Sequence, residues 1–161
     1  MRTLRWLALV AVVLAALSLG AGGAAAAGNG RNFVAHLAGS QETPPNSTLS
    51  QGEAIFHLSP DGSTLSYKLI VANIDNVTVA HIHLGMPGVA GPVVVFLYHG
   101  PTIAGRFDGV LAEGTITAAD LTGPLAGQSL STLLNDIRSG DAYVNVHTTQ
   151  FPAGQIRGQI H

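Results

Sequence analysis

Cysteine is absent from all 161 residues of this chain. The absence excludes disulfide bridges, a thiol nucleophile, iron–sulfur clusters and the cysteine-ligated types of zinc and copper site. Small exported domains often rely on disulfides, so a domain without them must be stabilised by core packing or by a bound ligand. The sequence therefore has to supply a well-packed apolar core.

Charged residues are also scarce. They make up 10% of the chain, and Lys68 is its single lysine. Without Arg2 and Arg5, the chain keeps five basic residues against nine acidic ones. A mildly acidic chain with no basic stripe does not suit nucleic acid or an anionic membrane surface as a partner. The motifs G-x-S-x-G and H-E-x-x-H and paired carboxylates are absent as well, so the sequence does not indicate a hydrolase.

The longest apolar run lies near the N-terminus. Met1–Arg5 is basic, Trp6–Leu17 is a run of 12 apolar residues, and a Gly/Ala tract then ends at Ala27. This order is typical of a secretory signal peptide, and the run is shorter than the roughly 20 residues that span a membrane. We predict a signal peptide over residues 1–27 and one domain over residues 28–161. The mature protein would be secreted, or lie in the periplasm or on the exterior of the cell envelope, without membrane contact.

The rest of the chain consists of short segments separated by Gly, Pro, Asn and Asp. Apolar and polar residues alternate in most segments, as they do in strands with one face on a core. We expect eight strands, at Asn32–Ala38, Gly52–Leu58, Leu65–Val71, Val77–Leu84, Val93–Tyr98, Gly109–Ile116, Ala142–His147 and Gly154–Ile160. This pattern favours an all-β fold, either an antiparallel β-sandwich of immunoglobulin-like or superoxide-dismutase-like type or a small barrel.

One segment has the period of a helix instead. The apolar residues recur at spacings of three, one and three, at Leu130, Leu133, Leu134 and Ile137. Ser129 is placed to cap the start of this helix, and Gly140 is placed to end it. The sequence therefore predicts one short helical insertion near residues 129–139. A helical turn is also expected over Ala118–Leu121, led by Thr117.

Histidine is plentiful for a chain with so few charges. All seven histidines follow residue 27, at His36, His57, His81, His83, His99, His147 and His161. His81-Ile82-His83 falls within a predicted strand, where alternate side chains share a face and their Cα atoms lie roughly 6.6–6.8 Å apart. Two imidazoles at that spacing can converge on one metal ion.

His147 ends a second predicted strand of the same kind. Val144 and Val146 are expected to face the core, so His147 points to the opposite face. Three imidazoles from two strands would suit a copper ion, with zinc as the alternative, and would leave a coordination position open. A fourth ligand could come from His99, His36 or Met86. The competing interpretation is that the histidines are structural, because the sequence does not tell whether the two strands are neighbours.

Several motifs in order resemble a known family. They lie at Phe33–Ala35, Gly39–Pro45, Ala80–Gly85, Gly91–Val94, Tyr143–Thr148 and Pro152–Gln159. Together they span nearly the whole of residues 28–161, and they resemble the CHRD domain, which is named from the chordin family and is widespread in bacterial secreted proteins. The resemblance implies an all-β domain, associated in animals with binding secreted growth factors, and no established catalytic mechanism.

The motifs A-H-I-H and N-V-H-T of this resemblance carry His81, His83 and His147. Their arrangement is also similar to the copper site of copper/zinc superoxide dismutases, as a likeness of site alone. Three hypotheses follow: a secreted, non-catalytic protein that binds, stores or delivers copper; a metal-free interaction or adhesion module with an extracellular protein partner; and a redox enzyme of superoxide dismutase type. The acidic charge disfavours the enzyme, because an anionic substrate is steered by positive charge. The sequence does not indicate the oligomeric state.

Overall fold

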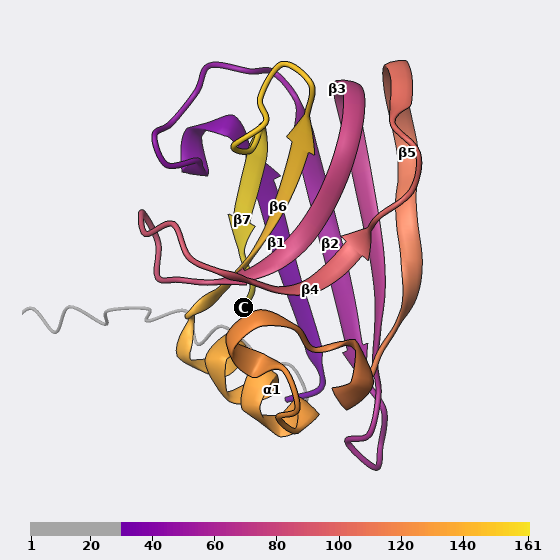
Figure 1. Cartoon of the computed structure of the whole chain (residues 1–161), viewed down its shortest axis with the longest axis vertical. Coiled ribbons are helices and arrows are strands. Elements are labelled where there is room, and N and C mark those ends of the chain that lie inside the picture. The colour runs from indigo at the N-terminus through magenta and orange to yellow at the C-terminus, as the bar shows by residue number, and fades with distance from the viewer. Residues whose placement is uncertain (1–29) are drawn as a thin grey trace, which may run out of the picture.

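The computed structural model describes residues 30–161, so the expected signal peptide lies outside the described residues. Seven strands and one α-helix follow one another within these described residues (Figure 1). They are β1 (Asn32–Ala38), β2 (Gln51–Leu58), β3 (Leu65–Leu84), β4 (Val93–Tyr98), β5 (Ile103–Ile116), α1 (Leu130–Ser139), β6 (Ala142–Thr148) and β7 (Ile156–Gln159). None of the helices that the structure describes combines the length and apolarity needed to cross a membrane.

The strands form one antiparallel sheet that closes on itself. The order is β2-β1-β7-β6-β3-β4, and β2 also pairs with β3, so that five strands complete a ring. The two remaining strands, β4 and β5, pair with β3 outside this ring. The all-β, antiparallel fold with one short helix is confirmed, in the form of a barrel-like closed sheet.

The closure depends on β3, which is a single strand of 20 residues where two strands were expected. Asn73 and Asn76 have positive φ angles of 57° and 54°, and the register with β5 shifts around them. Asparagine tolerates this left-handed conformation, so the strand bends there without ending. The first half of β3 pairs with β2 and β5, and the second half pairs with β6 and β4.

The apolar faces of the ring strands meet inside the barrel, and α1 lies at one end of it (Figure 1). The four apolar residues whose spacing predicted the helix are all buried: Leu130, Leu133, Leu134 and Ile137. Gly140 ends the helix at φ 77°, as expected, but the Ser129 hydroxyl contacts the hydroxyls of Ser131 and Thr132 instead of capping a backbone N–H. The turn at Ala118–Asp120 has the expected cap from Thr117.

The outer face of the barrel is not exposed everywhere. All seven residues of β6 are buried, although alternate residues of a strand point to opposite faces. The outward residues of β6 are therefore covered by something other than the core. They are covered where polar side chains meet the loops at residues 39–46, 85–92 and 149–155.

Candidate metal centre

The pairing of β3 with β6 brings the three predicted histidines together. The register places His147 opposite Val79, two residues before His81 on the same strand face. One ring nitrogen from each of His81, His83 and His147 lies within 4.8 Å of the others. The histidines are close neighbours because β3 and β6 are adjacent, which strand alternation alone could not establish.

The centre is nearly closed to solvent. The exposed fractions are 8% for His81, 9% for His83 and 9% for His147. Part of the cover is the loop at residues 85–92, where Gly91 passes very close to the end of β3. A Cβ atom on Gly91 would lie 1.5 Å from the carbonyl oxygen of Leu84, so no larger residue fits this path.

Backbone carbonyls fix the tautomers of two imidazoles. His83 Nδ1 lies 2.9 Å from the carbonyl oxygen of Gly91, and His147 Nδ1 lies 3.0 Å from that of Pro152. Because a carbonyl oxygen only accepts, both Nδ1 atoms carry the proton and both Nε2 atoms keep a lone pair. His147 Nε2 lies 3.2 Å from His81 Nδ1, whereas His83 Nε2 is buried without any hydrogen-bond partner.

The electrostatics of the centre favour neutral imidazoles. Burial, together with the neighbouring His147, His83 and His99, lowers the pKa of His81 from 6.5 to about 3. Burial also lowers the pKa values of His83 and His147, although their carbonyl hydrogen bonds act in the opposite direction. All three rings are therefore neutral at pH 7, which is the form that binds metal.

The His83 ring belongs to a stack of three side chains. The His83 ring lies parallel to Tyr143, with ring centroids 4.9 Å apart, and the Arg157 guanidinium carbon lies 3.4 Å from the Tyr143 centroid. Arg157 is 2% exposed and donates to the carbonyl oxygens of Met86 and Val89 at 2.9 and 3.0 Å. The arginine therefore joins β7 to the loop that covers the centre.

Asn145 and Glu42 extend the buried polar region beside the histidines. In the sheet register, Asn145 lies opposite His81 of β3 and opposite Arg157 of β7. Its Nδ2 donates to Glu42 Oε1 at 2.8 Å. Burial raises the pKa of Glu42 from 4.5 to about 7, although Arg157 acts to lower it. Gly154, at φ 132°, makes room for both side chains, because its Cβ would lie 2.5 Å from Asn145 Nδ2.

Asn145, Arg157 and Glu42 were not predicted from the sequence as residues of this site. Strand alternation does place Asn145 on the face of His147, so the signal for that residue was present. Glu42 lies in a Pro-containing loop with no period, and only the folded structure brings it to β6.

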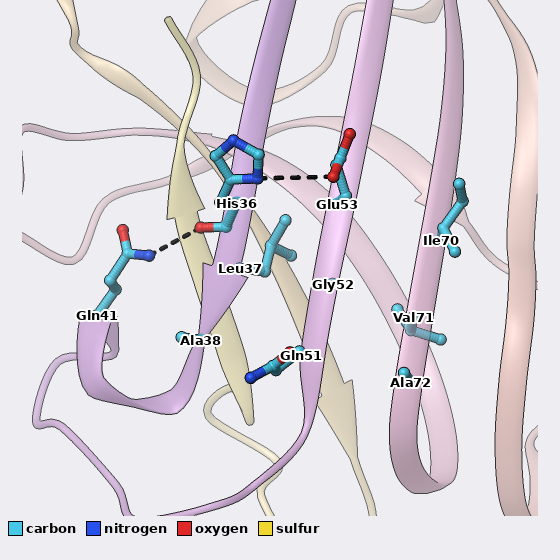
Figure 2. Close-up of a pocket in the computed structure, with 10 residues that line it drawn as sticks. All are labelled: His36, Leu37, Ala38, Gln41, Gln51, Gly52, Glu53, Ile70, Val71 and Ala72. Carbon is cyan, nitrogen blue, oxygen red and sulfur yellow. Dashed lines mark hydrogen bonds and ion pairs between the residues drawn. The ribbon is translucent and has the colours of Figure 1, made fainter.

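The candidate fourth ligands do not join this group. His36 lies on the outer face of β1, where its Nδ1 is 3.6 Å from Glu53 Oε2, and both residues line a groove of about 410 Å³ (Figure 2). His99 lies against Phe96, which in turn contacts His81 with ring centroids 4.8 Å apart. The Met86 side chain is 59% exposed. Within residues 30–161, the one group of three or more His, Cys, Asp and Glu side chains placed so that it could hold a metal ion consists of these three histidines.

Comparison with known proteins gives one family and one relative. Residues 33–160 match the CHRD domain family. Chordin of Xenopus laevis is 32% identical over 133 residues, which cover 78% of this chain and 12% of that protein. The chain thus corresponds to a small part of this relative's length. No solved structure gives a significant match.

Proposed function

Because the chain belongs to the CHRD domain family, we propose that it is a secreted binding protein of chordin type that holds one copper ion on His81, His83 and His147. The proposed role is non-catalytic: the protein binds the ion and stores or delivers it. Export is proposed from the signal-peptide pattern of residues 1–27.

The observation that carries the metal proposal is the unpartnered Nε2 atom of His83. Leaving a buried polar atom without a partner costs about 1–3 kcal/mol, and the hydrogen bond to Gly91 makes this atom a lone-pair donor. One ring nitrogen of each of His81, His83 and His147 lies within 4.8 Å of the other two. A metal ion would satisfy the orphaned nitrogen and engage the other two rings.

The donor set favours copper over other ions. Three neutral imidazoles without a thiolate or a carboxylate suit copper and zinc, and copper(II) binds such nitrogen sites more tightly than zinc. The hydrogen bonds from His83 and His147 to carbonyl oxygens would orient both rings toward the ion. When bound, the ion would supply an open coordination position for a further ligand. The protein's own part is to hold three neutral nitrogens in a nearly dry site.

Copper titration by calorimetry, with a competing chelator if binding is tight, tests this proposal. The parent should bind about one equivalent at pH 7, and alanine at His81, His83 or His147 should each weaken binding by at least roughly tenfold. His57→Ala is the control, because His57 is an exposed histidine on β2 outside the group. If His81→Ala binds copper as tightly as the parent does, the three-histidine site is wrong and the metal-free interaction module becomes the better hypothesis.

The identity of the ion needs a separate measurement. Elemental analysis of protein taken from its native compartment, without passage over a nickel column, should find copper. Zinc in its place would keep the site and change the ion, whereas protein without metal would contradict the proposed role.

A further inference from the structure

The outer edge of β5 is open. This strand has 14 residues and pairs with β3 along one edge, and no strand described in residues 30–161 pairs with its other edge. Figure 1 shows β5 at the side of the molecule, beyond β3 and away from the ring. An edge strand of this length presents a row of backbone N–H and C=O groups that can pair with another strand.

A bulge interrupts the alternation of inward and outward side chains along β5. In the register with β3, Glu113 lies opposite Lys68 and Val110 lies opposite Ile70, so that Leu111 is an extra residue between the two pairs. This bulge shifts the alternation by one residue. Arg106, Val110 and Glu113 consequently all lie on the outer, exposed face, although 106 and 113 are an odd number of residues apart.

We propose that two copies of this chain form a dimer by antiparallel pairing of β5 with β5, with Arg106 of each copy opposite the partner's Glu113. Because Leu111 is an extra residue in each copy, Asp108 then lies opposite the partner's Val110, and the two-fold axis passes through Gly109. Directly opposite residues of antiparallel strands must share a face, and the bulge at Leu111 satisfies this condition for Arg106 and Glu113. The interface is the same patch on both copies, so the assembly closes as a dimer.

Charge selects this register over its neighbours. Arg106 already lies 3.2 Å from Asp108, and Lys68 lies 3.3 Å from Glu113, measured between their charged atoms. The proposed pairing places these pairs side by side across the interface, with charges that alternate in sign. A shift of two residues in one direction would place Asp108 opposite the partner's Glu113, and two carboxylates opposite each other repel.

A shift of two residues in the other direction is no better. It would place Arg106 opposite the partner's Val110 and Asp108 opposite the partner's Asp108, so that the Arg106–Glu113 pair is lost and two carboxylates repel. A shift of one residue would oppose outward with inward side chains on both sides of the bulge. The proposed register is therefore the one that matches faces and charges together.

Val110 gives a second reason for the same register. It is 47% exposed, one of few large apolar side chains with such exposure in the part of the chain that the structure describes. Next to the two-fold axis, the two Val110 side chains would lie close together on one face and shield each other from water. This apolar centre is flanked by the charged pairs at both ends.

Sedimentation velocity over roughly 1–500 µM protein tests the dimer, since a small strand-to-strand interface implies modest affinity. A chelator in the buffer prevents copper from bridging two copies, so the result is independent of the proposed metal function. The parent should dimerise, and Val110→Lys should be a monomer with an unchanged circular dichroism spectrum, because it places two ammonium groups beside the axis. Ile55→Lys is the matched control: Ile55 is 43% exposed but lies on β2, so this variant should dimerise like the parent.

Charge reversal tests the register itself. Arg106→Glu should raise the dimer dissociation constant by roughly two- to thirtyfold, because two exposed ion pairs are lost per dimer. The double variant Arg106→Glu/Glu113→Arg should recover most of that loss. A monomeric parent, or a dimer that Val110→Lys leaves intact, would overturn the proposal, and the open edge would then be free for a strand of another protein. Failure of the double variant to recover affinity would overturn the register.

Discussion

At the scale of single residues, protonation governs what the candidate centre can bind. An unperturbed imidazole has a pKa of about 6.5, so an exposed three-histidine site loses metal to protons below that pH. Burial lowers the pKa values of His81, His83 and His147, and that of His81 falls to about 3. Protons therefore compete with the metal only at lower pH than they would at an exposed site.

We predict that copper affinity stays nearly constant from pH 7.5 down through pH 6.5 and declines only at lower pH. The physical reason is that the metal-free rings are still neutral below their ordinary pKa. Competition titrations with a chelator of known proton affinity, repeated at half-unit intervals of pH, measure this. Affinity that is already halved at pH 6.5 would show that the three rings titrate like exposed histidines.

Glu42 gives a residue-scale prediction for stability. Its pKa is about 7 in the folded state and 4.5 as the reference value, so the folded state binds the extra proton between these pH values. The resulting stabilisation is fully present below pH 4.5 and is lost as the pH rises through 7. Glu42→Gln removes this dependence, since a neutral amide does not titrate. Relative to the parent, the variant should therefore be more stable at pH 8.5 than at pH 5, which means that its unfolding free energy compares better with that of the parent at the higher pH.

Urea denaturation of the metal-free proteins at the two pH values measures that difference. Glu53→Gln is the control, because the Glu53 side chain is 45% exposed and lies outside the buried polar region, where it lines the groove. If the unfolding free energy of Glu42→Gln differs from that of the parent by the same amount at both pH values, the inference about Glu42 is wrong.

At the scale of elements, the loop between β3 and β4 determines the orientation of His83. Its closeness to the strand depends on Gly91, whose carbonyl oxygen accepts the hydrogen bond from His83 Nδ1. Arg157 holds the same loop from β7 through two further carbonyl oxygens. The loop therefore closes the centre and selects the tautomer of one ligand at the same time.

Gly91→Ala should displace this loop, because the new Cβ would lie 1.5 Å from the Leu84 carbonyl oxygen. We expect a loss of about 1–3 kcal/mol in unfolding free energy and weaker copper binding, since the hydrogen bond to His83 is broken. Thermal denaturation and copper titration measure the two effects.

Gly88→Ala is the control within the same loop. Gly88 has a φ of 77° and nothing within 4 Å of an added Cβ, so its cost is a backbone strain of about 1–2 kcal/mol without a collision. Its copper affinity should stay close to that of the parent. If both variants weaken copper binding equally, the effect comes from loop strain and not from the contact of Gly91 with His83.

At the scale of the whole molecule, the metal proposal links binding to folding. The three histidines come from β3 and β6, which lie far apart in sequence, and the ligand geometry exists only when the barrel is closed. A ligand that binds the folded state alone stabilises it by an amount that grows with the logarithm of its concentration. The single closed sheet should respond as one cooperative unit.

Copper at a hundredfold excess over its dissociation constant should therefore stabilise the parent by about 2.7 kcal/mol. The midpoint of thermal unfolding should rise with copper concentration in the parent and in His57→Ala, and should not rise in His81→Ala. A rise of the same size in His81→Ala would mean that the ion stabilises the protein from another site.

Much of the fold follows from local sequence patterns. Strand alternation predicted most of the strands, the helical period around Leu133 predicted α1, and His81-Ile82-His83 fixed two imidazoles on one face. Each of these depends on the spacing of side chains within a few residues, which the backbone geometry of a strand or a helix converts directly into a face. The family resemblance could be read from the same segments and was confirmed by the match over residues 33–160.

Only the tertiary structure decided which strands are neighbours. The contact between His81 and His147 joins residues 66 apart, and it depends on the pairing of β3 with β6 in one register. The continuity of β3 past Asn73, the cover from Gly91, and the approach of Glu42 to Asn145 likewise arise from long-range packing. Local periodicity carries no information on such partners, because the free energy that selects them comes from closing the whole barrel.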